Sequence, residues 1–396
     1  MLSVMILLIL TGMTGCAGTP STPLTPGERP TDTPLPAAPA WRVAAHPITV
    51  DNVPQLTQLG RLEAPGTPTT VFAWALSPDN TRLVALNNSF LLSWDLVTGR
   101  LVFSTSRDDA TRVFYSPDKD QVFAVATDGS IYVVNSEDGT FENTLLGIQG
   151  YNDVSSYDPD EGLLALASAP GDIKVWNLID QVELITLPGS GSQAIALAFS
   201  PDNSLLAIGY DLGIVLIWDW RNQIVKAVPV LPDNQSGAVD QLLFSPDGQY
   251  LIGTAGDAGL VWSVSDGALL HTLPVGVGGS NYLFKTSTTG PFIITGGTAA
   301  DATLWNILDG KLASALPDMG GNNLDGVFSP DGNLLFTSLY TDEVVLWNLA
   351  NLANGSIARS NQPIENSNIL NLIWTDDGFL VLLIDARGPI EVWGIP

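Results

Sequence analysis

Histidine and cysteine are almost missing from this sequence. Its 396 residues include two histidines and one cysteine, namely His46, His271 and Cys16. One cysteine cannot form an intramolecular disulfide framework. Transition-metal sites need clusters of histidine and cysteine, and the chain has neither these nor a GxSxG nucleophile motif. We therefore expect no catalytic residues, no metal site and no cofactor.

Basic residues are also scarce. The chain has 15 Lys and Arg residues against 41 Asp and Glu residues, which gives a formal net charge of −26. Such a surface repels nucleic-acid phosphates and anionic lipid headgroups, so we expect no nucleic-acid partner. Apolar residues make up 45% of the chain, enough for a large hydrophobic core. We expect a monomer.

The N-terminus has the pattern of an export signal. Residues 2–10 read LSVMILLIL, an apolar run too short to cross a bilayer core of about 30 Å as a helix. Small residues and a cysteine follow, in the order Met13-Thr14-Gly15-Cys16. This order resembles the lipobox of bacterial lipoproteins, in which the cysteine receives a lipid. The resemblance implies a signal peptide over residues 1–16 and an extracytoplasmic domain anchored through Cys16 to the cell membrane or the outer membrane.

The segment that follows is predicted to be a linker. Residues 17–40 are dominated by Pro and Thr, a composition that cannot bury a core and favours extended polyproline-II conformations. At ~3.1 Å per residue such a segment reaches roughly 70 Å. We therefore expect residues 17–45 to be a disordered spacer between the membrane and the folded domain.

From residue 46 onward the sequence repeats a pattern about 42 residues long. Each unit has an apolar stretch, a turn, a second apolar stretch, a polar turn and a third stretch. The first turn reads Ser-Pro-Asp at residues 77–80, 116–119, 200–203, 245–248 and 329–332, and is degenerate at 158–161 and 375–378. The third stretch closes on Trp94, Val134, Trp176, Trp218, Trp262, Trp305, Trp347 and Trp393. A fixed period of this length is typical of β-propeller blades.

The apolar stretches are predicted to be β-strands. They are short, rich in Val, Ile, Leu and Phe, and bounded by Pro, Asp, Asn and Gly. Only three residues follow Trp393, too few for the further strand that follows each earlier closing position, but residues 55–64 can supply it. We therefore predict an all-β fold, a single propeller of eight four-stranded blades closed by an N-terminal strand. A seven-bladed ring with one irregular unit is the alternative.

The repeats resemble those of WD-repeat proteins. A strand ends in Trp94-Asp95 and another in Trp218-Asp219, and Trp-Asn takes the same place in three further units. The resemblance covers about residues 54–396 and implies a rigid scaffold that binds protein partners. The family's Gly-His pair is missing, so its His–Asp–Trp hydrogen-bond network is not expected.

The loops at one end of such a ring vary between blades and are the expected place for a protein or peptide partner. The repeat phase places them at residues 147–153, 210–213, 276–282, 319–325, 340–343 and 385–388. Tyrosine offers a large contact area with a polar tip, which suits interfaces. The expected contact residues are Tyr151, Asn152, Asp153, Tyr210, Asp211, Asn281, Tyr282, Asn323, Tyr340, Asp342 and Arg387.

Two other functions stay open at this point. Paired carboxylates could hydrolyse glycans, although the Asp residues that recur in every turn are better explained as hairpin residues. Three or more non-repeating Asp, Glu or Arg residues in the central mouth would favour such a glycosidase or lyase. The other alternative is a structural factor in envelope assembly, which would copurify with its partner in fixed proportion.

Overall fold

The computed structural model describes residues 41–64, 71–169, 171–232, 237–256, 258–274, 283–287, 289–297, 300–316, 323–339, 344–349, 357–358, 369–385 and 389–396. Residues 1–40 lie outside these ranges, and with them the predicted signal peptide, Cys16 and most of the predicted linker. Among the described residues, no helix is long and apolar enough to cross a membrane.

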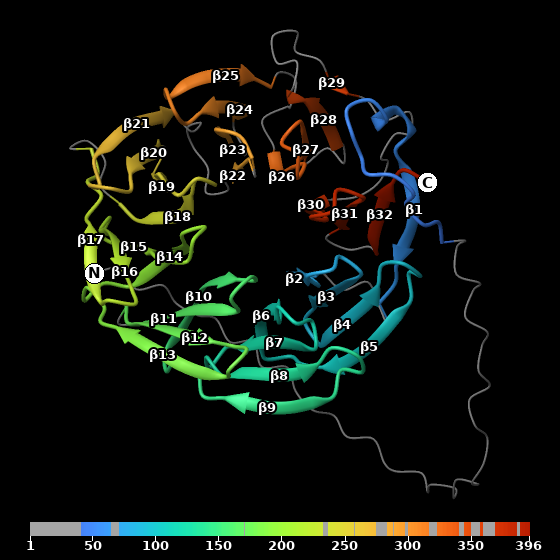
Figure 1. The fold of residues 1–396 in the computed structure, drawn as a ribbon, viewed down its shortest axis with the longest axis horizontal. Coiled ribbons are helices and arrows are strands. Elements are labelled where there is room, and N and C mark those ends of the chain that lie inside the picture. Colours follow the sequence, from blue (N-terminus) through green and yellow to red (C-terminus); the bar gives the residue numbers. More distant parts are fainter. Residues whose placement is uncertain are drawn as a thin grey trace, which may run out of the picture. The chain divides into compact units, whose positions relative to one another are not determined.

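The described chain forms eight four-stranded antiparallel sheets arranged as a ring, which confirms the predicted eight-bladed propeller (Figure 1). Strands β2, β6, β10, β14, β18, β22, β26 and β30 lie innermost, one per blade (Figure 1). A short 3₁₀ helix, η1 (Val53–Gln55), precedes the first strand.

The blades follow the chain in order, with strands given from the inside of the ring outward. Blade 1 contains β2 (Ala73–Leu76), β3 (Arg82–Leu86), β4 (Phe90–Asp95) and β5 (Leu101–Ser106). Blade 2 contains β6 (Ala110–Tyr115), β7 (Gln121–Ala126), β8 (Ile131–Asn135) and β9 (Phe141–Leu145). Blade 3 contains β10 (Tyr151–Asp158), β11 (Leu163–Ser168), β12 (Ile173–Asn177) and β13 (Val182–Leu187). Blade 4 contains β14 (Ala194–Phe199), β15 (Leu206–Tyr210), β16 (Val215–Asp219) and β17 (Ile224–Ala227).

Blade 5 contains β18 (Val239–Phe244), β19 (Tyr250–Ala255), β20 (Ala258–Ser263) and β21 (Leu269–Pro274). Blade 6 contains β22 (Leu283–Thr286), β23 (Phe292–Gly297), β24 (Ala300–Asn306) and β25 (Lys311–Ala315). Blade 7 contains β26 (Asn323–Phe328), β27 (Leu334–Leu339), β28 (Val344–Asn348) and β29 (Ile357–Ala358). Blade 8 contains β30 (Ile369–Trp374), β31 (Leu380–Asp385), β32 (Ile390–Gly394) and, outermost, β1 (Thr57–Leu62).

Burial along the strands follows from the stacking of blades. The second strand of blade 3, β11, is buried at all six positions, whereas the outer strand β13 is exposed at four of six. A strand between two neighbouring strands and two neighbouring blades has both faces covered, so it is apolar throughout. The core therefore lies between the blades, with the inner and outer strands at its two margins.

The N-terminal strand closes the ring as predicted. Strand β1 pairs with β32 from Thr57–Gly394 to Leu62–Ile390, and this closure leaves no seven-bladed alternative. Ile48, Val53 and Leu56, each at most 3% exposed, pack into a core cluster that joins blades 7 and 8. We refer to residues 41–56 as the clasp.

The clasp begins earlier than the sequence indicated. Residues 41–45 belong to the predicted linker, yet the Arg42 main-chain N–H donates to the Leu59 carbonyl at 3.0 Å. The Ala45 N–H donates to the Ile395 carbonyl at 2.8 Å, and His46 forms an isolated bridge with Ile395. The folded domain therefore includes Trp41 and the residues after it.

The recurring Asp residues stabilise the turns between first and second strands. In blade 4 the Ser200 hydroxyl donates to the Asp202 carboxylate at 2.7 Å, and the Leu205 N–H donates back to the Ser200 oxygen at 2.9 Å. The same serine or threonine contact recurs in blades 1, 2, 5, 7 and 8. A contact repeated once per blade serves the hairpin.

The closing tryptophans pack between blades, and several donate hydrogen bonds that do not involve histidine. Trp305 donates from Nε1 to the Thr295 hydroxyl at 2.9 Å, and Trp347 donates to Thr337 at 3.0 Å. Trp94 donates instead to the Glu63 carbonyl at 2.9 Å. These contacts satisfy the indole N–H groups of Trp94, Trp305 and Trp347 in the absence of the family's Gly-His pair.

Candidate site at the channel mouth

The two ends of the ring differ in what they expose. One end carries the Ser-Pro-Asp turns and the connections between third and fourth strands; we call it the turn face. The other end carries the connections between second and third strands and those that lead into each inner strand; we call it the channel face. Because neighbouring strands are antiparallel, each kind of connection returns to the same end in every blade.

The inner strands are irregular near the channel face. In β18, Val239 pairs with Ala255 and Gln241 with Thr254, so Asp240 has no partner in the ladder. The equivalent shift leaves out Thr111 in β6 and Ile195 in β14. Such bulges bend a strand and re-aim a side chain. Of these bulge residues, Ile195 and Asp240 line the cavity described next.

A cavity of about 460 Å³ lies among these inner strands. Its lining comes from six of them: β6, β10, β14, β18, β22 and β26. Many of the lining residues, such as Asp153, Ile195 and Asp240, lie near the starts of their strands, which places the cavity toward the channel face. The volume is within the range of roughly 300–1,000 Å³ that is usual for ligand sites.

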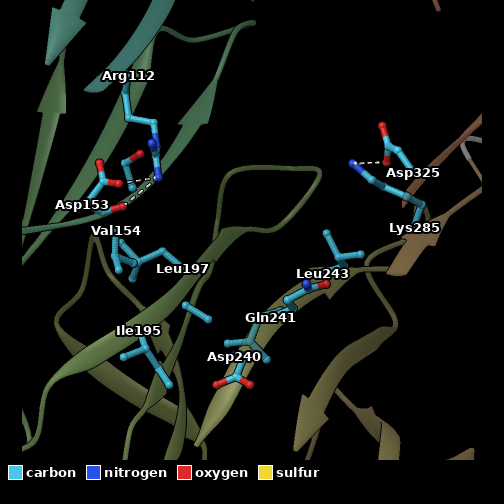
Figure 2. A pocket seen from close by; sticks show the side chains of 13 residues that line it. Arg112, Asp153, Val154, Ile195, Leu197, Asp240, Gln241, Leu243, Lys285 and Asp325 are labelled. Atoms are coloured by element: carbon cyan, nitrogen blue, oxygen red, sulfur yellow. Dashed lines mark hydrogen bonds and ion pairs between the residues drawn. The ribbon is translucent and has the colours of Figure 1, made fainter. Parts of the chain in front are cut away.

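One ion pair lies on the blade 2 and blade 3 side of the cavity. Nη2 of Arg112 lies 3.0 Å from Oδ2 of Asp153 and also donates to the Asp153 carbonyl at 3.0 Å (Figure 2). Asp153 has a positive φ of 64° and lies in the part of β10 where the ladder with β11 is interrupted. The Arg112 guanidinium is thus fixed by two contacts to a single residue.

A second ion pair lies on the blade 6 and blade 7 side. Nζ of Lys285 is 3.7 Å from Oδ1 of Asp325 (Figure 2), and the Asp325 side chain is only 8% exposed. Oδ2 of Asp325 accepts the main-chain N–H of Leu372 at 2.9 Å. Burial raises the pKa of Asp325, although Lys285 and the N–H of Leu372 act in the opposite direction.

Asp240 stands between the two pairs in the order of the blades and differs from both. Asp240 lines the cavity and is exposed, and no hydrogen bond or ion pair to it exists within the part of the chain that the structure describes. Partial burial raises the pKa of this carboxyl. Asp240 is therefore the lining carboxylate that is free to receive a positive group.

The structure brings three of the residues predicted from sequence to this region. Tyr151, Asn152 and Asp153 begin the inner strand β10 and do not form a loop. Asn152 donates from Nδ2 to the Ala194 carbonyl of blade 4 at 2.7 Å, and Tyr151 packs against the blade 2 and blade 3 core. Of the three, Asp153 lines the cavity and is exposed.

Tyr210 and Asp211 occupy different environments although they are adjacent. Tyr210 is fully buried and belongs to the core cluster of blades 3 and 4, so its ring is covered and offers no contact surface to a partner. The strand β15 ends on it, and what looks like a loop residue in the sequence is a packing residue. Asp211 is exposed on the channel face, in the turn between β15 and β16.

The other predicted contact residues are not placed. Asn281, Tyr282, Tyr340, Asp342 and Arg387 lie outside the described residues, and of Asn323 only the main chain, in β26, is described.

Four charged lining residues were not among those predicted: Arg112, Asp240, Lys285 and Asp325. Each lies in an inner strand, although the repeat phase places Asp325 at the end of the predicted loop 319–325. A signal is nevertheless present, because Asp240 occupies the bulge position that holds an apolar residue, Ile195, in the preceding blade.

The channel face also carries exposed apolar side chains that do not recur between blades. Leu146 is 82% exposed in the connection from β9 to β10, and Leu212 is 72% exposed between β15 and β16. On the turn face, by contrast, Val97, Ile179 and Leu308 occupy one equivalent position in their blades. The residues on the turn face hold a position that recurs in the turns between third and fourth strands. Leu146 and Leu212 are instead exposed on the channel face.

Comparisons with known proteins agree with this fold. Residues 70–296, more than half of the chain, match the model of the nucleolar protein 10-like N-terminal domain, a β-propeller. The chain belongs to this propeller family. No curated protein matches the sequence.

Solved structures superpose on this propeller at low sequence identity. The Dos1 propeller has a TM-score of 0.67 at 15% identity, covering 86% of this chain and 94% of that one. The C-terminal WD40 domain of Sif2 has a TM-score of 0.65 at 14% identity, covering 86% and 98%. Sqt1 of Chaetomium thermophilum, bound to the N-terminus of the ribosomal protein L10, has a TM-score of 0.64 at 17% identity, covering 83% and 97%. These similarities show that the propeller fold is shared with them.

Within this propeller the described residues contain no group of three or more His, Cys, Asp or Glu side chains arranged to hold a metal ion. The cavity lining instead combines three carboxylates, two cations and apolar side chains such as Ile195 and Leu197. Such a lining can bind a charged side chain together with its apolar stem.

Proposed function

We propose that this WD40-type propeller is a lipid-anchored, extracytoplasmic scaffold that holds a protein or peptide partner on its channel face. The cavity carries the proposal, because its charged residues do not recur between blades and no hairpin requires them. WD40 propellers typically act as protein-interaction scaffolds, and Sqt1, which shares the fold, was solved with the N-terminus of a partner protein. The order Met13-Thr14-Gly15-Cys16 supports the lipid anchor.

The exposed apolar side chains on the channel face support an interface around the cavity. Leu146, in the connection from β9 to β10, and Leu212, in the turn between β15 and β16, are 82% and 72% exposed on this face. Non-repeating apolar side chains around a charged centre give an interface both contact area and orientation.

The clasp fits a tether that leaves the channel face free. The described chain begins at Trp41, whose ring lies against Gly99. Gly99 belongs to the turn between β4 and β5, which is on the turn face. A linker that joins the domain there would present the channel face to the surroundings.

A pull-down from solubilised membranes tests the proposal. The baits are the wild-type chain, the Cys16→Ala variant and a Leu146→Ser, Leu212→Ser double variant. The wild-type chain should fractionate with membranes and recover a discrete protein, and Cys16→Ala should be soluble. The double variant should lose most of that protein. A partner recovered in fixed proportion through purification would indicate an assembly factor, whereas recovery of no protein by the wild type would contradict the scaffold.

A carboxylate-dependent enzyme is the second candidate, because non-repeating Arg112, Asp153, Asp240 and Asp325 do gather at the central mouth. Glycoside hydrolysis needs one carboxyl group as acid and another as base or nucleophile. In the cavity Asp153 is paired with Arg112 and Asp325 is buried beside Lys285, which leaves Asp240 as the accessible acid. Turnover of glycans by the wild-type chain, lost in Asp240→Asn, would establish the enzyme.

A further inference from the structure

We infer that the partner inserts a cationic side chain, Lys or Arg on an extended segment, into the channel, where the Asp240 carboxylate receives it. The inference rests on the proposed function and names the chemistry of the partner. Three observations support it. Asp240 lines the cavity without a partner among the described residues, the two basic residues of the lining are each paired with another carboxylate, and the cavity is large enough for a long side chain.

The charges that line the cavity do not balance. Asp153, Asp240 and Asp325 are opposed by Arg112 and Lys285. Arg112 is held by Asp153 through side chain and main chain, and Lys285 faces Asp325. One carboxylate is left over, and it is the one at the β18 bulge.

The pairing also excludes an anionic partner group from the centre. A phosphate or carboxylate would have to displace Asp153 from Arg112 while it approached the free Asp240. Its approach would also be opposed by the net charge of −26. The same charge attracts a cation from solution and raises the association rate.

The walls on either side of Asp240 suit a long basic side chain. Ile195 and Leu197 of β14 line the cavity on one side, and Leu243 lines it within β18 itself (Figure 2). Lys and Arg can pack their apolar stems on such walls while the charged end meets a carboxylate. A cavity of about 460 Å³ admits side chains or an extended segment, and a folded domain would remain on the rim.

Fluorescence anisotropy tests the inference with the detergent-solubilised full chain. The probes are a fluorescein-labelled octapeptide of alternating Gly and Arg and its counterpart with Gln in place of Arg. The Arg peptide should bind the wild type and the Gln peptide should not. Asp240→Asn should weaken binding roughly 10- to 100-fold, since a hydrogen bond to a charged group is lost. Added salt should weaken the wild-type complex more than that of Asp240→Asn.

The matched control is Asp211→Asn, which removes an equal charge from the same face but outside the cavity. It should change the affinity less than threefold. Equal losses of affinity in the two variants would show that only net charge matters and would overturn the inference. Binding of the Gln peptide to the wild type, or no binding of the Arg peptide, would also overturn it. A partner recovered equally by wild type and Asp240→Asn in the membrane pull-down would refute the cationic insertion and leave the scaffold standing. No partner and no peptide binding would refute both.

Discussion

The Asp325 carboxylate accepts the main-chain N–H of Leu372 at 2.9 Å, so a buried acid of blade 7 holds the inner strand of blade 8. The main-chain N–H of Asp325 in turn donates to the Ser338 hydroxyl at 3.1 Å, within its own blade. The inner strands of the last two blades are thereby linked beside the clasp, where the ring closes. Asp325 therefore both lines the cavity and helps to hold the closed ring together.

Asp325→Ala should lower the free energy of unfolding by about 1–3 kcal/mol, because the N–H of Leu372 would be left buried without an acceptor. Asp325→Asn keeps an acceptor oxygen and should cost less at neutral pH. Urea denaturation followed by tryptophan fluorescence measures both. Equal stability of Asp325→Ala and wild type would show that the inter-blade bond contributes nothing.

Asp325 should also make the stability of the protein depend on pH in a predictable direction. Burial raises the pKa of Asp325, so the folded state favours its protonated form. The stability that this group contributes is present below its unfolded pKa of about 3.9 and is lost as the pH rises through the folded pKa. Asp325→Asn should therefore fall further below wild type at pH 4 than at pH 7, as read from urea midpoints. A larger deficit at pH 7 would contradict this.

The turn carboxylates titrate in the opposite direction. Hydrogen bonds from Ser200 and Ser204 lower the pKa of Asp202 below its usual value. The stability it contributes is present above the unfolded pKa of about 3.9 and is lost as the pH falls through the folded pKa. Between pH 5 and pH 2.5 the fall in stability should be smaller for Asp202→Asn than for wild type. An equal fall in the two proteins would contradict a contribution from Asp202.

Gly171 tests how tightly neighbouring blades approach on the channel face. Its φ is +93°, and an added Cβ would lie 2.1 Å from the Ser192 carbonyl oxygen. Gly171→Ala should lower the free energy of unfolding by about 2–4 kcal/mol, which combines left-handed strain with the clash. Gly191 has a similar φ of +84° with nothing near its Cβ position, so Gly191→Ala should cost only about 1–2 kcal/mol. Equal losses would show that the close approach does not matter.

The clasp should contribute much of the stability of the closed ring. Leu56 is 1% exposed in the cluster that joins blades 7 and 8, so Leu56→Ala should cost about 2–5 kcal/mol. Val43 lies in the same segment but is 60% exposed, and Val43→Ala should change stability by less than about 0.5 kcal/mol. Chemical denaturation of the two variants distinguishes a docked clasp from a loosely attached one.

The architecture was predictable because it repeats. A tryptophan and a turn that recur about every 42 residues define eight units, and residues 55–64 are predicted to supply the outer strand of the last blade. The pairing of β1 (residues 57–62) with β32 confirms that closure. Local turn chemistry and periodic burial are sufficient for such a fold, since each blade contacts only its neighbours.

The site was predictable only in part, because it arises where the repeats differ. Arg112, Asp240 and Lys285 lie in three different blades and come together only when the ring closes. The bulge at Asp240 is a property of the β18–β19 ladder, and the sequence marks it only by a charged residue where the preceding blade has Ile195. Tyr210 shows the converse: its position beside a turn suggested exposure, but the packing of blade 3 covers it.

Site-specific photo-crosslinking tests most directly whether the channel face meets the partner. A benzoylphenylalanine placed at Leu212 lies on the channel face, and one at Leu308 lies on the turn face; these leucines are 72% and 52% exposed, respectively. Irradiation of membranes should join a discrete protein to the Leu212 derivative and none to the Leu308 derivative. Crosslinks from Leu308 alone, or equal crosslinks from both, would contradict a scaffold that binds through its channel face.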